Sequence, residues 1–372
     1  MTKKKTETEN EIKFYSLQNI LKQNADYNII FGERSNGKTY ALLEYAIKNF
    51  VAKGTQTAYI RRWREDLKGK RAETLFQNHI QNGFVSRETN DIYNSVVYKN
   101  GKFYLSKETE NEKLICEKPF CYCFALSEME HDKSTSYPEI TTIIFDEFLT
   151  RRYYLPDEFI LFMNLLSTII RQRNNVKIFM LGNTVNKYCP YFTEMGLKNV
   201  TIQKQGTIDV YSFGVDGCKI AVEYAAPVET KKASNKYFCF DNDKLKMITG
   251  GKWELEAYPH LPVKYKPKDI QFIYYIIFGE NILQCEIINN GFDYFTFIHQ
   301  KTTPIKDIEN SLIYSLESNG KPNFKRRLIS SLSDIEKKIA AFFVADKVFY
   351  QSNEIGEIVR NYIQVSNKTN LL

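Results

Sequence analysis

The feature that most constrains the fold of this chain is the motif G-x-x-x-x-G-K-T, which runs from Gly32 to Thr39. Such a loop binds phosphates where a strand precedes it and a helix follows, because backbone N–H groups and the start of the helix then face the ligand. The apolar run "YNIIF" precedes the motif, and apolar residues recur at helical spacing from Leu42 to Phe50. The motif therefore predicts a nucleotide site on an α/β sheet.

The residues of this loop suit the parts of a nucleoside triphosphate. Gly37 lets the backbone approach the phosphates, Lys38 meets the β- and γ-phosphates, and the Thr39 hydroxyl ligates Mg²⁺. A plain glycine turn is the alternative, but it leaves Lys38 unexplained. We therefore expect ATP and Mg²⁺ as cofactors. The predicted nucleotide-binding residues of the loop are Gly32, Glu33, Arg34, Ser35, Asn36, Gly37, Lys38, Thr39 and Tyr40.

Length and composition favour a globular protein of about two domains. The chain has 372 residues, 43% of them hydrophobic, and its net charge of +7 is compatible with a polyanionic partner. It has no apolar run long enough to span a membrane, and the N-terminal stretch "MTKKKTETENE" lacks the apolar core of a signal peptide. We expect a cytoplasmic protein with a disordered tail over residues 1–13.

Apolar runs after the loop predict further strands. Residues 56–63 ("QTAYIRRW"), 121–126 ("CYCFAL"), 140–148 ("ITTIIFDEF") and 176–184 ("VKIFMLGNT") are candidates for buried strands. Residues 95–106 are typical of a β-hairpin, because Asn100-Gly101 supplies a tight turn. The alternation of strands with helical patterns predicts an α/β domain with a parallel sheet.

Two carboxylates and an amide follow strands of this predicted sheet. Ligands lie outside the carboxyl ends of parallel strands, so Asp146 and Glu147 should reach the same edge as the phosphate loop. Asp146 would bind Mg²⁺ and Glu147 would deprotonate the attacking water, with a solvated strand end as the alternative. Asn183 can contact the γ-phosphate or the water, or it can cap its strand.

Other classes of phosphate-loop protein fit less well. A GTPase would carry N-K-x-D after a late strand, but the nearest match, "NKYC" at residues 186–189, lacks the aspartate. A small-molecule kinase has little use for Glu147 as a water-activating base. An ATPase that does mechanical work fits better, with the strand of the catalytic glutamate placed away from the strand of the phosphate loop.

The C-terminal part of the chain predicts a second domain. Strand patterns at residues 270–279, 281–288 and 294–300, followed by two helical patterns, suggest an α+β unit of the ribonuclease-H kind. A nuclease of that kind needs carboxylates that converge on Mg²⁺, and Asp269, Glu280, Glu286 and Asp293 are available, mostly at turns or on differing faces. The predicted division is a tail at 1–13, a phosphate-loop ATPase domain at 14–226, a linker region at 227–266 and the second domain at 267–372.

Several segments together resemble the genome-packaging ATPases, or encapsidation proteins, of small short-tailed phages of the phi29 type. The resemblance runs through "FYSLQ", "GERSNGKT", "QTAYIRRW", "NGKFYL", "KSTSYPEITTIIFDEF", "YLPDEFILFMNLLSTIIRQR" and "LGNTVNKYCPYF", over residues 14 to about 192. It implies a terminase-like, RecA-like ATPase of the additional-strand, catalytic-glutamate type. A linker would join this ATPase to a degenerate ribonuclease-H-like domain.

The resemblance also implies partners and roles. The chain would form a homo-oligomeric ring, a pentamer, on the portal of an empty capsid in the bacterial host cytoplasm, with double-stranded DNA and a packaging RNA as further partners. Phe14, Tyr15 and Gln18 look like the adenine-side segment of the family; from the residues alone they could cap a helix. Arg64 falls near the nucleotide lid, with a solvated arginine as the alternative.

An arginine finger that acts on a neighbouring subunit is expected at the end of one helix. An apolar helical face is formed by Leu165, Leu166, Ile169 and Ile170, so Arg171 and Arg173 should emerge at the helix end. A guanidinium stays charged and offers forked donors to phosphate oxygens. The resemblance places the finger at Arg171, with Arg173 as the second candidate; both could instead only complement the helix dipole.

Three functions remain open from the sequence. The first is an ATP-driven motor that moves double-stranded viral DNA into a procapsid, the second is a translocase with an active C-terminal nuclease, and the third is a DNA- or portal-binding scaffold with a relict nucleotide site. Some basic residues are candidates for contact with DNA, although a solvated surface is the simpler interpretation of each. These candidates are Lys68, Lys70, Arg71, Lys99 and Lys102.

Overall fold

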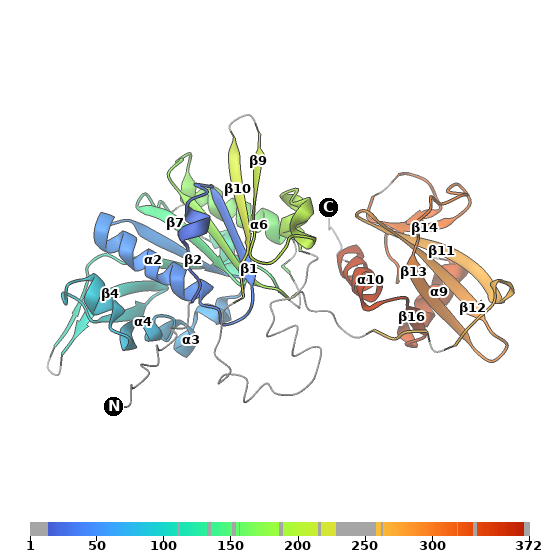
Figure 1. Cartoon of the computed structure of the whole chain (residues 1–372), viewed down its shortest axis with the longest axis horizontal. Coiled ribbons are helices and arrows are strands. Elements are labelled where there is room, and N and C mark those ends of the chain that lie inside the picture. Colours follow the sequence, from blue (N-terminus) through green and yellow to red (C-terminus); the bar gives the residue numbers. More distant parts are fainter. Residues whose placement is uncertain are drawn as a thin grey trace, which may run out of the picture. The chain divides into compact units, whose positions relative to one another are not determined.

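The computed structural model divides the chain into two compact units, residues 1–254 and 255–372. The division falls inside the stretch that was expected to be a linker, most of which lies outside the described residues. The structure describes residues 14–109, 112–131, 135–150, 154–155, 157–185, 189–214, 217–227, 258–261, 263–317, 319–329 and 333–367. Each unit is described separately below (Figure 1).

The first unit is built on one large mixed sheet. Six neighbouring strands are parallel and lie in the order β6-β2-β7-β8-β1-β10. Beyond β6, the sheet continues with β4 and then β3, each antiparallel to the strand before it, and β5 also pairs with β4. Beyond β10, the sheet ends with β9, which is antiparallel to β10. The strands are β1 (Tyr27–Gly32), β2 (Gln56–Arg61), β3 (Ser95–Lys99), β4 (Lys102–Glu108), β5 (Lys113–Ile115), β6 (Cys121–Ala125), β7 (Ile140–Asp146), β8 (Lys177–Asn183), β9 (Ile208–Phe213) and β10 (Cys218–Tyr224).

The hairpin of β3 and β4 turns at Asn100-Gly101, where both residues have a positive φ, of 51° and 74°. This is the left-handed backbone that a two-residue hairpin turn requires, and asparagine and glycine adopt it most readily. The strand β8 lies between β1, which leads into the phosphate loop, and β7, which ends in the two carboxylates. The carboxyl ends of all three strands therefore meet at one edge of the sheet.

Helices cover both faces of this sheet. Successive residues of a strand point to opposite faces, and the buried strands carry apolar side chains on both, so each face needs its own layer of helices. One core contains Ile29 and Phe145 of the sheet with apolar residues of α6, and the other contains Ile30 and Ile144 with apolar residues of α2. The helices are α1 (Gln18–Leu21), α2 (Lys38–Lys53), α3 (Gly69–Glu73), α4 (Gln77–Gln81), α5 (Phe84–Glu88), α6 (Glu158–Ile170) and α7 (Pro190–Glu194), with 3-10 turns η1 (Arg64–Leu67), η2 (Leu126–His131) and η3 (Lys198–Thr201).

The second unit contains a six-stranded sheet in the order β15-β14-β11-β12-β13-β16. Strands β11, β12 and β13 form an antiparallel meander, while β14 and β15 continue it in parallel on one side and β16 on the other. Tyr362 of α10 packs on Phe278 of the meander, with ring centroids 5.8 Å apart. The elements are η5 (Pro267–Asp269), β11 (Ile270–Phe278), β12 (Asn281–Asn289), β13 (Tyr294–Gln300), β14 (Leu312–Ser315), β15 (Phe324–Lys325), α9 (Asp334–Val344), β16 (Val348–Tyr350) and α10 (Asn353–Ser366).

Candidate nucleotide site

A cavity of about 650 Å³ opens at the carboxyl ends of β1, β7 and β8. This volume lies within the range of small-molecule sites. The phosphate loop contributes residues 35–40 to its wall, β7 and the residue after it contribute Asp146 and Glu147, and β8 contributes Leu181, Gly182 and Asn183. Phe14, Asn78 and Asn82 complete the lining. The sheet topology thus brings together residues as far apart in the sequence as Ser35 and Asn183.

Lys38 is buried and points at oxygen atoms. Its Nζ lies 2.5 Å from the carbonyl oxygen of Glu33, 3.0 Å from Oδ1 of Asn36 and 3.5 Å from Oδ1 of Asn183. Burial lowers the pKa of Lys38 to about 8, against the opposing effect of the Asp146 and Glu33 carboxylates. A phosphate group that entered the cavity would stabilise the charged ammonium, so the side chain is already placed for an anionic ligand.

Gly37 shapes the loop at the start of α2. Its φ is 94°, a left-handed backbone conformation, and an added Cβ would lie 3.3 Å from Cβ of Phe14. The backbone N–H of Tyr15 also donates to the carbonyl oxygen of Asn36 at 2.9 Å. The N-terminal segment therefore lies directly against the loop. Of the other predicted loop residues, Gly32, Glu33 and Arg34 do not line the cavity, and Arg34 is exposed.

Thr39 and Asp146 meet at the centre of the site. The Thr39 hydroxyl lies 3.2 and 3.4 Å from the two carboxylate oxygens of Asp146, and the Tyr59 hydroxyl donates to Oδ2 at 2.8 Å. Asp146 is only 6% exposed. Hydroxyl and carboxylate oxygens are the ligands that Mg²⁺ prefers, and Mg²⁺ usually takes one or two carboxylates together with substrate phosphates. This donor set fits Mg²⁺ bound with a triphosphate.

Glu147 is held by an arginine that the sequence analysis did not single out. Its carboxylate oxygen Oε2 lies 2.6 Å from Nη2 of Arg61, at the end of β2. The other terminal nitrogen of Arg61 lies 3.5 Å from Asp146, and Nη2 also lies 3.6 Å from Asp66. Burial opposes the charge of Arg61, but the neighbouring Tyr59, Asp146 and Glu147 raise its pKa, so it stays cationic.

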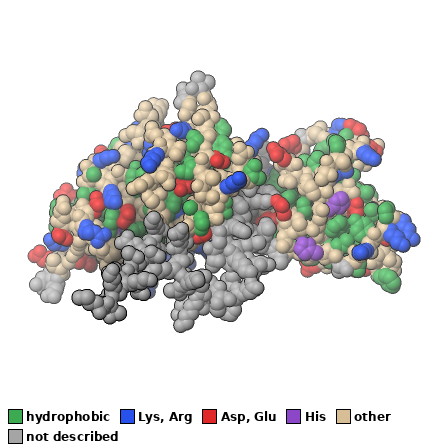
Figure 2. Space-filling view, viewed as in Figure 1, with side chains coloured by type: hydrophobic (Ala, Val, Ile, Leu, Met, Phe, Trp, Pro, Cys, Tyr) green, Lys and Arg blue, Asp and Glu red, His purple; other side chains and the backbone are tan. Residues whose placement is uncertain are grey.

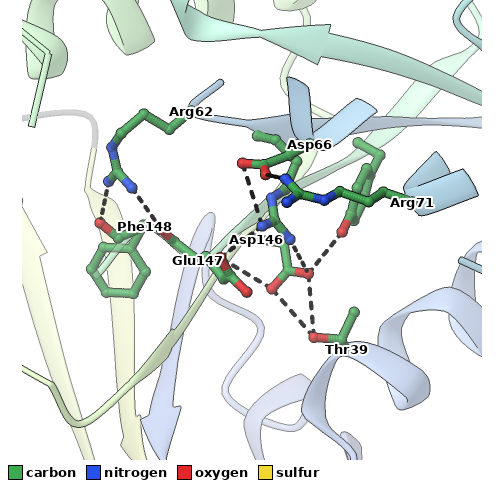
Figure 3. Close-up of polar contacts among 9 residues, drawn as sticks. Thr39, Arg62, Asp66, Arg71, Asp146, Glu147 and Phe148 are labelled. Atoms are coloured by element: carbon green, nitrogen blue, oxygen red, sulfur yellow. Dashed lines mark hydrogen bonds and ion pairs between the residues drawn. The ribbon is translucent and has the colours of Figure 1, made fainter. Parts of the chain in front are cut away.

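The backbone at Glu147 is strained and firmly supported. Its φ is 58°, a left-handed value that is rare for a residue with a side chain, and such strain often collects at functional sites. The N–H of Glu147 donates to Oδ1 of Asp146 at 3.0 Å, and Nη1 of Arg62 donates to the Glu147 carbonyl oxygen at 3.0 Å. Arg62 also donates to the carbonyl oxygen of Phe148 at 2.6 Å (Figure 3).

Arg62 is itself fixed by a buried ion pair with Glu158 of α6. Two parallel contacts of 2.7 and 2.9 Å join the guanidinium to the carboxylate, and the Tyr191 hydroxyl donates to Glu158 at 2.8 Å. Through Arg62, this ion pair supports the backbone directly after β7, at Glu147 and Phe148. In the sequence, Arg61 and Arg62 are visible only as two arginines at the end of a predicted buried strand. Their role at the site becomes apparent from the sheet order, which places this strand, β2, beside β7.

Only one of the three predicted adenine-side residues lines the cavity. Phe14 does, with 62% of its surface exposed. Tyr15 is anchored elsewhere: its hydroxyl donates to Oε2 of Glu223 on β10 at 2.6 Å, and burial raises the pKa of both groups. Gln18 is exposed at the start of α1 and does not line the cavity. Tyr15 therefore positions the segment that carries Phe14.

The two candidate arginine fingers lie at the opposite edge of the sheet. Helix α6 runs back from the end of β7 to the start of β8, so Arg171 and Arg173 are far from the cavity of their own subunit. Arg173 donates to four carbonyl oxygens, of Tyr137, Pro138, Ile169 and Ile170. Arg171 is exposed and donates to the carbonyl oxygen of Thr135 at 3.1 Å.

The candidate DNA-contact residues lie around α3 and the β3–β4 hairpin. Lys68 lies 4.0 Å from Glu65, Arg71 lies 2.9 Å from Asp66, and Lys102 lies over the ring of Tyr122. Lys70 and Lys99 are exposed, and Arg64 pairs with Glu128 at 3.3 Å. On the face shown in Figure 2, basic and acidic side chains are interspersed over this unit. None of these residues lines the nucleotide cavity.

The four carboxylates of the second unit do not converge. Asp269 caps η5, Glu280 lies in the turn after β11, and Asp293 pairs with Lys347. Glu286 is buried on β12, where it accepts from Tyr265, Gln284 and His299. Within the described part of the chain, no group of three or more histidine, cysteine or acidic side chains could hold a metal ion. The same residues include no helix long and apolar enough to cross a bilayer.

Known proteins similar to this chain are phage DNA packaging proteins. The DNA packaging protein of Bacillus phage PZA is 24% identical over 86% of this chain and 90% of its own length, and that of Bacillus phage B103 is 35% identical over 46% and 48%. The structure resembles the phi29 viral genome packaging motor assembly, with a TM-score of 0.56 at 21% identity over 95% and 99% of the two chains. It also resembles the Phi-28 gp11 DNA packaging motor, with a TM-score of 0.54 at 16% identity over 96% and 98%.

The two structural similarities extend over both units of the chain, although the sequence identities are only 16% and 21%. The model of one protein family, the podovirus DNA encapsidation protein (Gp16), matches residues 10–305. That range includes the phosphate loop, the two carboxylates and the meander of the second unit. The chain therefore belongs to the family of podovirus DNA encapsidation proteins.

Proposed function

We propose that this encapsidation protein hydrolyses ATP in the cavity at the end of β1, β7 and β8, and that the cycle moves double-stranded DNA into a procapsid. The observation that carries the proposal is the meeting of Lys38, Thr39, Asp146 and Glu147 around one cavity. The buried ammonium of Lys38 and the left-handed backbone of Glu147 each cost stability, which favours a working site over a relict one.

The residues of the site divide the work of hydrolysis. Lys38 binds the β- and γ-phosphates, and Asn183, which already contacts Lys38, orients the γ-phosphate or the water. Thr39 and Asp146 would hold Mg²⁺, and the bound cation would neutralise negative charge on the phosphates. Glu147 accepts the proton of the attacking water, because it is the carboxylate at the cavity whose side chain is accessible, at 59% exposed.

Arg61 sets the resting state of that base. While its guanidinium lies 2.6 Å from Oε2 of Glu147, that carboxylate oxygen is engaged in an ion pair rather than with water. The carboxylate must leave Arg61 before it can accept a proton from water. Arg61 retains Asp146 and Asp66 as partners when it does so, at 3.5 and 3.6 Å, which makes the release less costly.

The position of Arg171 supports catalysis between subunits. An exposed guanidinium at the far edge of the sheet cannot reach its own cavity, but in a ring it can face the cavity of a neighbour. We therefore retain Arg171 as the finger, and assign Arg173 to capping α6, because its donors already meet four carbonyl oxygens. We further propose that the chain assembles as a ring of five on the portal, with a packaging RNA as a further partner, as its resemblance to the phi29-type packaging ATPases implies.

The finer fold assignments belong to the same proposal. The strand β8 between β1 and β7 supports the additional-strand, catalytic-glutamate class of ATPase. The order β13-β12-β11-β14-β15, with three antiparallel strands followed by two parallel ones, supports a ribonuclease-H-like second unit. We propose that this unit does not cut DNA, since its carboxylates lie apart and Glu286 is engaged by three side chains.

Two substitutions test the assignment of the carboxylates. Glu147→Gln should bind ATP with Mg²⁺ like the wild type but lose turnover by about 100-fold or more, because general-base catalysis contributes roughly 10²–10⁴ in rate. Asp146→Asn should weaken the Mg²⁺-dependent part of ATP binding. Equilibrium binding and steady-state hydrolysis distinguish the two. Wild-type turnover in Glu147→Gln would remove the general-base assignment.

A further inference from the structure

The cavity has two chemically different ends. The ends of β7 and β8 provide Asp146, Glu147 and Asn183, which suit the γ-phosphate and the attacking water. The remaining wall comes from Phe14, from Tyr40 in the first turn of α2, and from α4 and the residue that follows it. If ATP binds as proposed above, its base must lie at the end away from the carboxylates. That end is bordered by Phe14 and by the α4 side of the cavity.

Helix α4 is fixed to the start of α2 through Tyr40. The ring of His79 stacks on the ring of Tyr40, with centroids 4.0 Å apart and an angle of 9° between the planes. The Nε2 atom of His79 lies 3.1 Å from the Tyr40 carbonyl oxygen. Burial lowers the pKa of His79, so the neutral ring donates this hydrogen bond. These contacts hold α4 against the first turn of α2, beside the phosphate loop.

The two asparagines on this wall differ in their hydrogen bonds. The amide of Asn82 is occupied, since it donates to the Tyr40 hydroxyl and accepts from the N–H of Phe84. Asn78 lies one turn earlier, on the same side of the helix. Its side chain is exposed to the cavity and has no hydrogen-bond partner among the residues that the structure describes. Asn78 thus offers both a donor and an acceptor to a ligand.

We propose that Asn78 reads the edge of the nucleotide base and selects adenine over guanine. A side-chain amide matches adenine on both atoms, because it accepts from the N6 amino group and donates to N7. Guanine presents acceptors at both O6 and N7, so the amide oxygen of Asn78 would face an acceptor. Phe14, which also lines the cavity, supplies an aromatic surface for the same base.

This inference rests on the proposed nucleotide site and predicts a change in preference rather than in hydrolysis. Asn78→Ala should weaken binding of Mg²⁺–ATP by about 10-fold or more and leave Mg²⁺–GTP unchanged, so the preference for ATP collapses. Asn78→Lys should favour GTP, because an ammonium donates to both O6 and N7 of guanine. Gln77→Ala, which removes an exposed amide from the same helix outside the cavity, is the matched control and should behave as the wild type.

The measurement is competition of ATP and GTP against a fluorescent ATP analogue, with Lys38→Ala as the control for the site itself. A collapsed preference in Asn78→Ala, with wild-type preference in Gln77→Ala, supports the assignment. An unchanged preference in Asn78→Ala, or no preference in the wild type, overturns it while the nucleotide site stands, provided that Lys38→Ala has lost binding. If Lys38→Ala binds like the wild type, the proposed site itself is wrong.

Discussion

At the scale of single residues, one set of side chains lines the cavity, and a second set, Arg61 and Arg62, holds the chain around Glu147 in place. Lys38, Thr39, Asp146 and Glu147 were predicted from motif and strand position, and they meet at one cavity. Arg61 and Arg62 were not, because a charged pair at a strand end is also what a solvated surface looks like. Their partners become visible only when β2 is known to lie beside β7.

The pair of Arg62 and Glu158 yields a stability prediction. The two side chains are 6% and 1% exposed, so removal of one leaves the other charged and buried. Arg62→Met should lower the free energy of unfolding by about 3–5 kcal/mol, whereas the double variant Arg62→Met/Glu158→Leu should recover much of that loss. Denaturant unfolding of the three proteins measures both effects. A single variant as stable as the wild type would show that the pair is not buried in solution.

At the scale of elements, strands were more predictable than the roles of helix ends. The strands of the large sheet have short apolar runs, and the turn at Asn100-Gly101 specifies its hairpin, so their positions followed from local patterns. The lateral order of the strands did not, because it depends on contacts between residues far apart in the chain. Nor could the pattern at the end of α6 separate Arg171 from Arg173, since both follow the same apolar face.

The end of α6 gives the next prediction. Arg171→Ala should fold and bind ATP normally but hydrolyse it poorly, by as much as the 10³–10⁵ that arginine fingers contribute. Arg173→Ala should instead lower stability, because it exposes the carbonyl oxygens that Arg173 now satisfies. Mixing Arg171→Ala with Glu147→Gln should restore some hydrolysis at interfaces with an intact Arg171 and an intact Glu147. Full turnover by Arg171→Ala, in a ring shown to assemble, would exclude the finger.

At the scale of the whole molecule, the two units differ in how far the sequence could describe them. The first carries motifs whose chemistry requires a particular geometry. For the second, the ribonuclease-H-like assignment rests only on the order of its strands. Its candidate carboxylates, all within the described residues, do not form a group that could hold a metal ion. Family membership, which spans residues 10–305, joins both units into one packaging protein.

Binding of DNA by such a protein should depend on the phosphate backbone. A motor must hold every base pair that passes, so its affinity should not vary with sequence. The logarithm of the binding constant should fall linearly with the logarithm of the salt concentration, with a slope of about −0.9 for each phosphate neutralised. Fluorescence anisotropy with two unrelated duplexes over a series of salt concentrations tests this. Affinity that is independent of salt, or selective for one duplex, would contradict a backbone grip.

The most direct test of the central claim, that ATP hydrolysis at Glu147 moves DNA, is the amount of nuclease-resistant DNA inside procapsids after incubation with this protein, ATP and Mg²⁺. The account predicts protected DNA with the wild type, and none with Glu147→Gln or with a non-hydrolysable ATP analogue, although both retain nucleotide binding. Equal protection with wild type and Glu147→Gln would contradict it, because DNA would then enter without the proposed hydrolysis at Glu147.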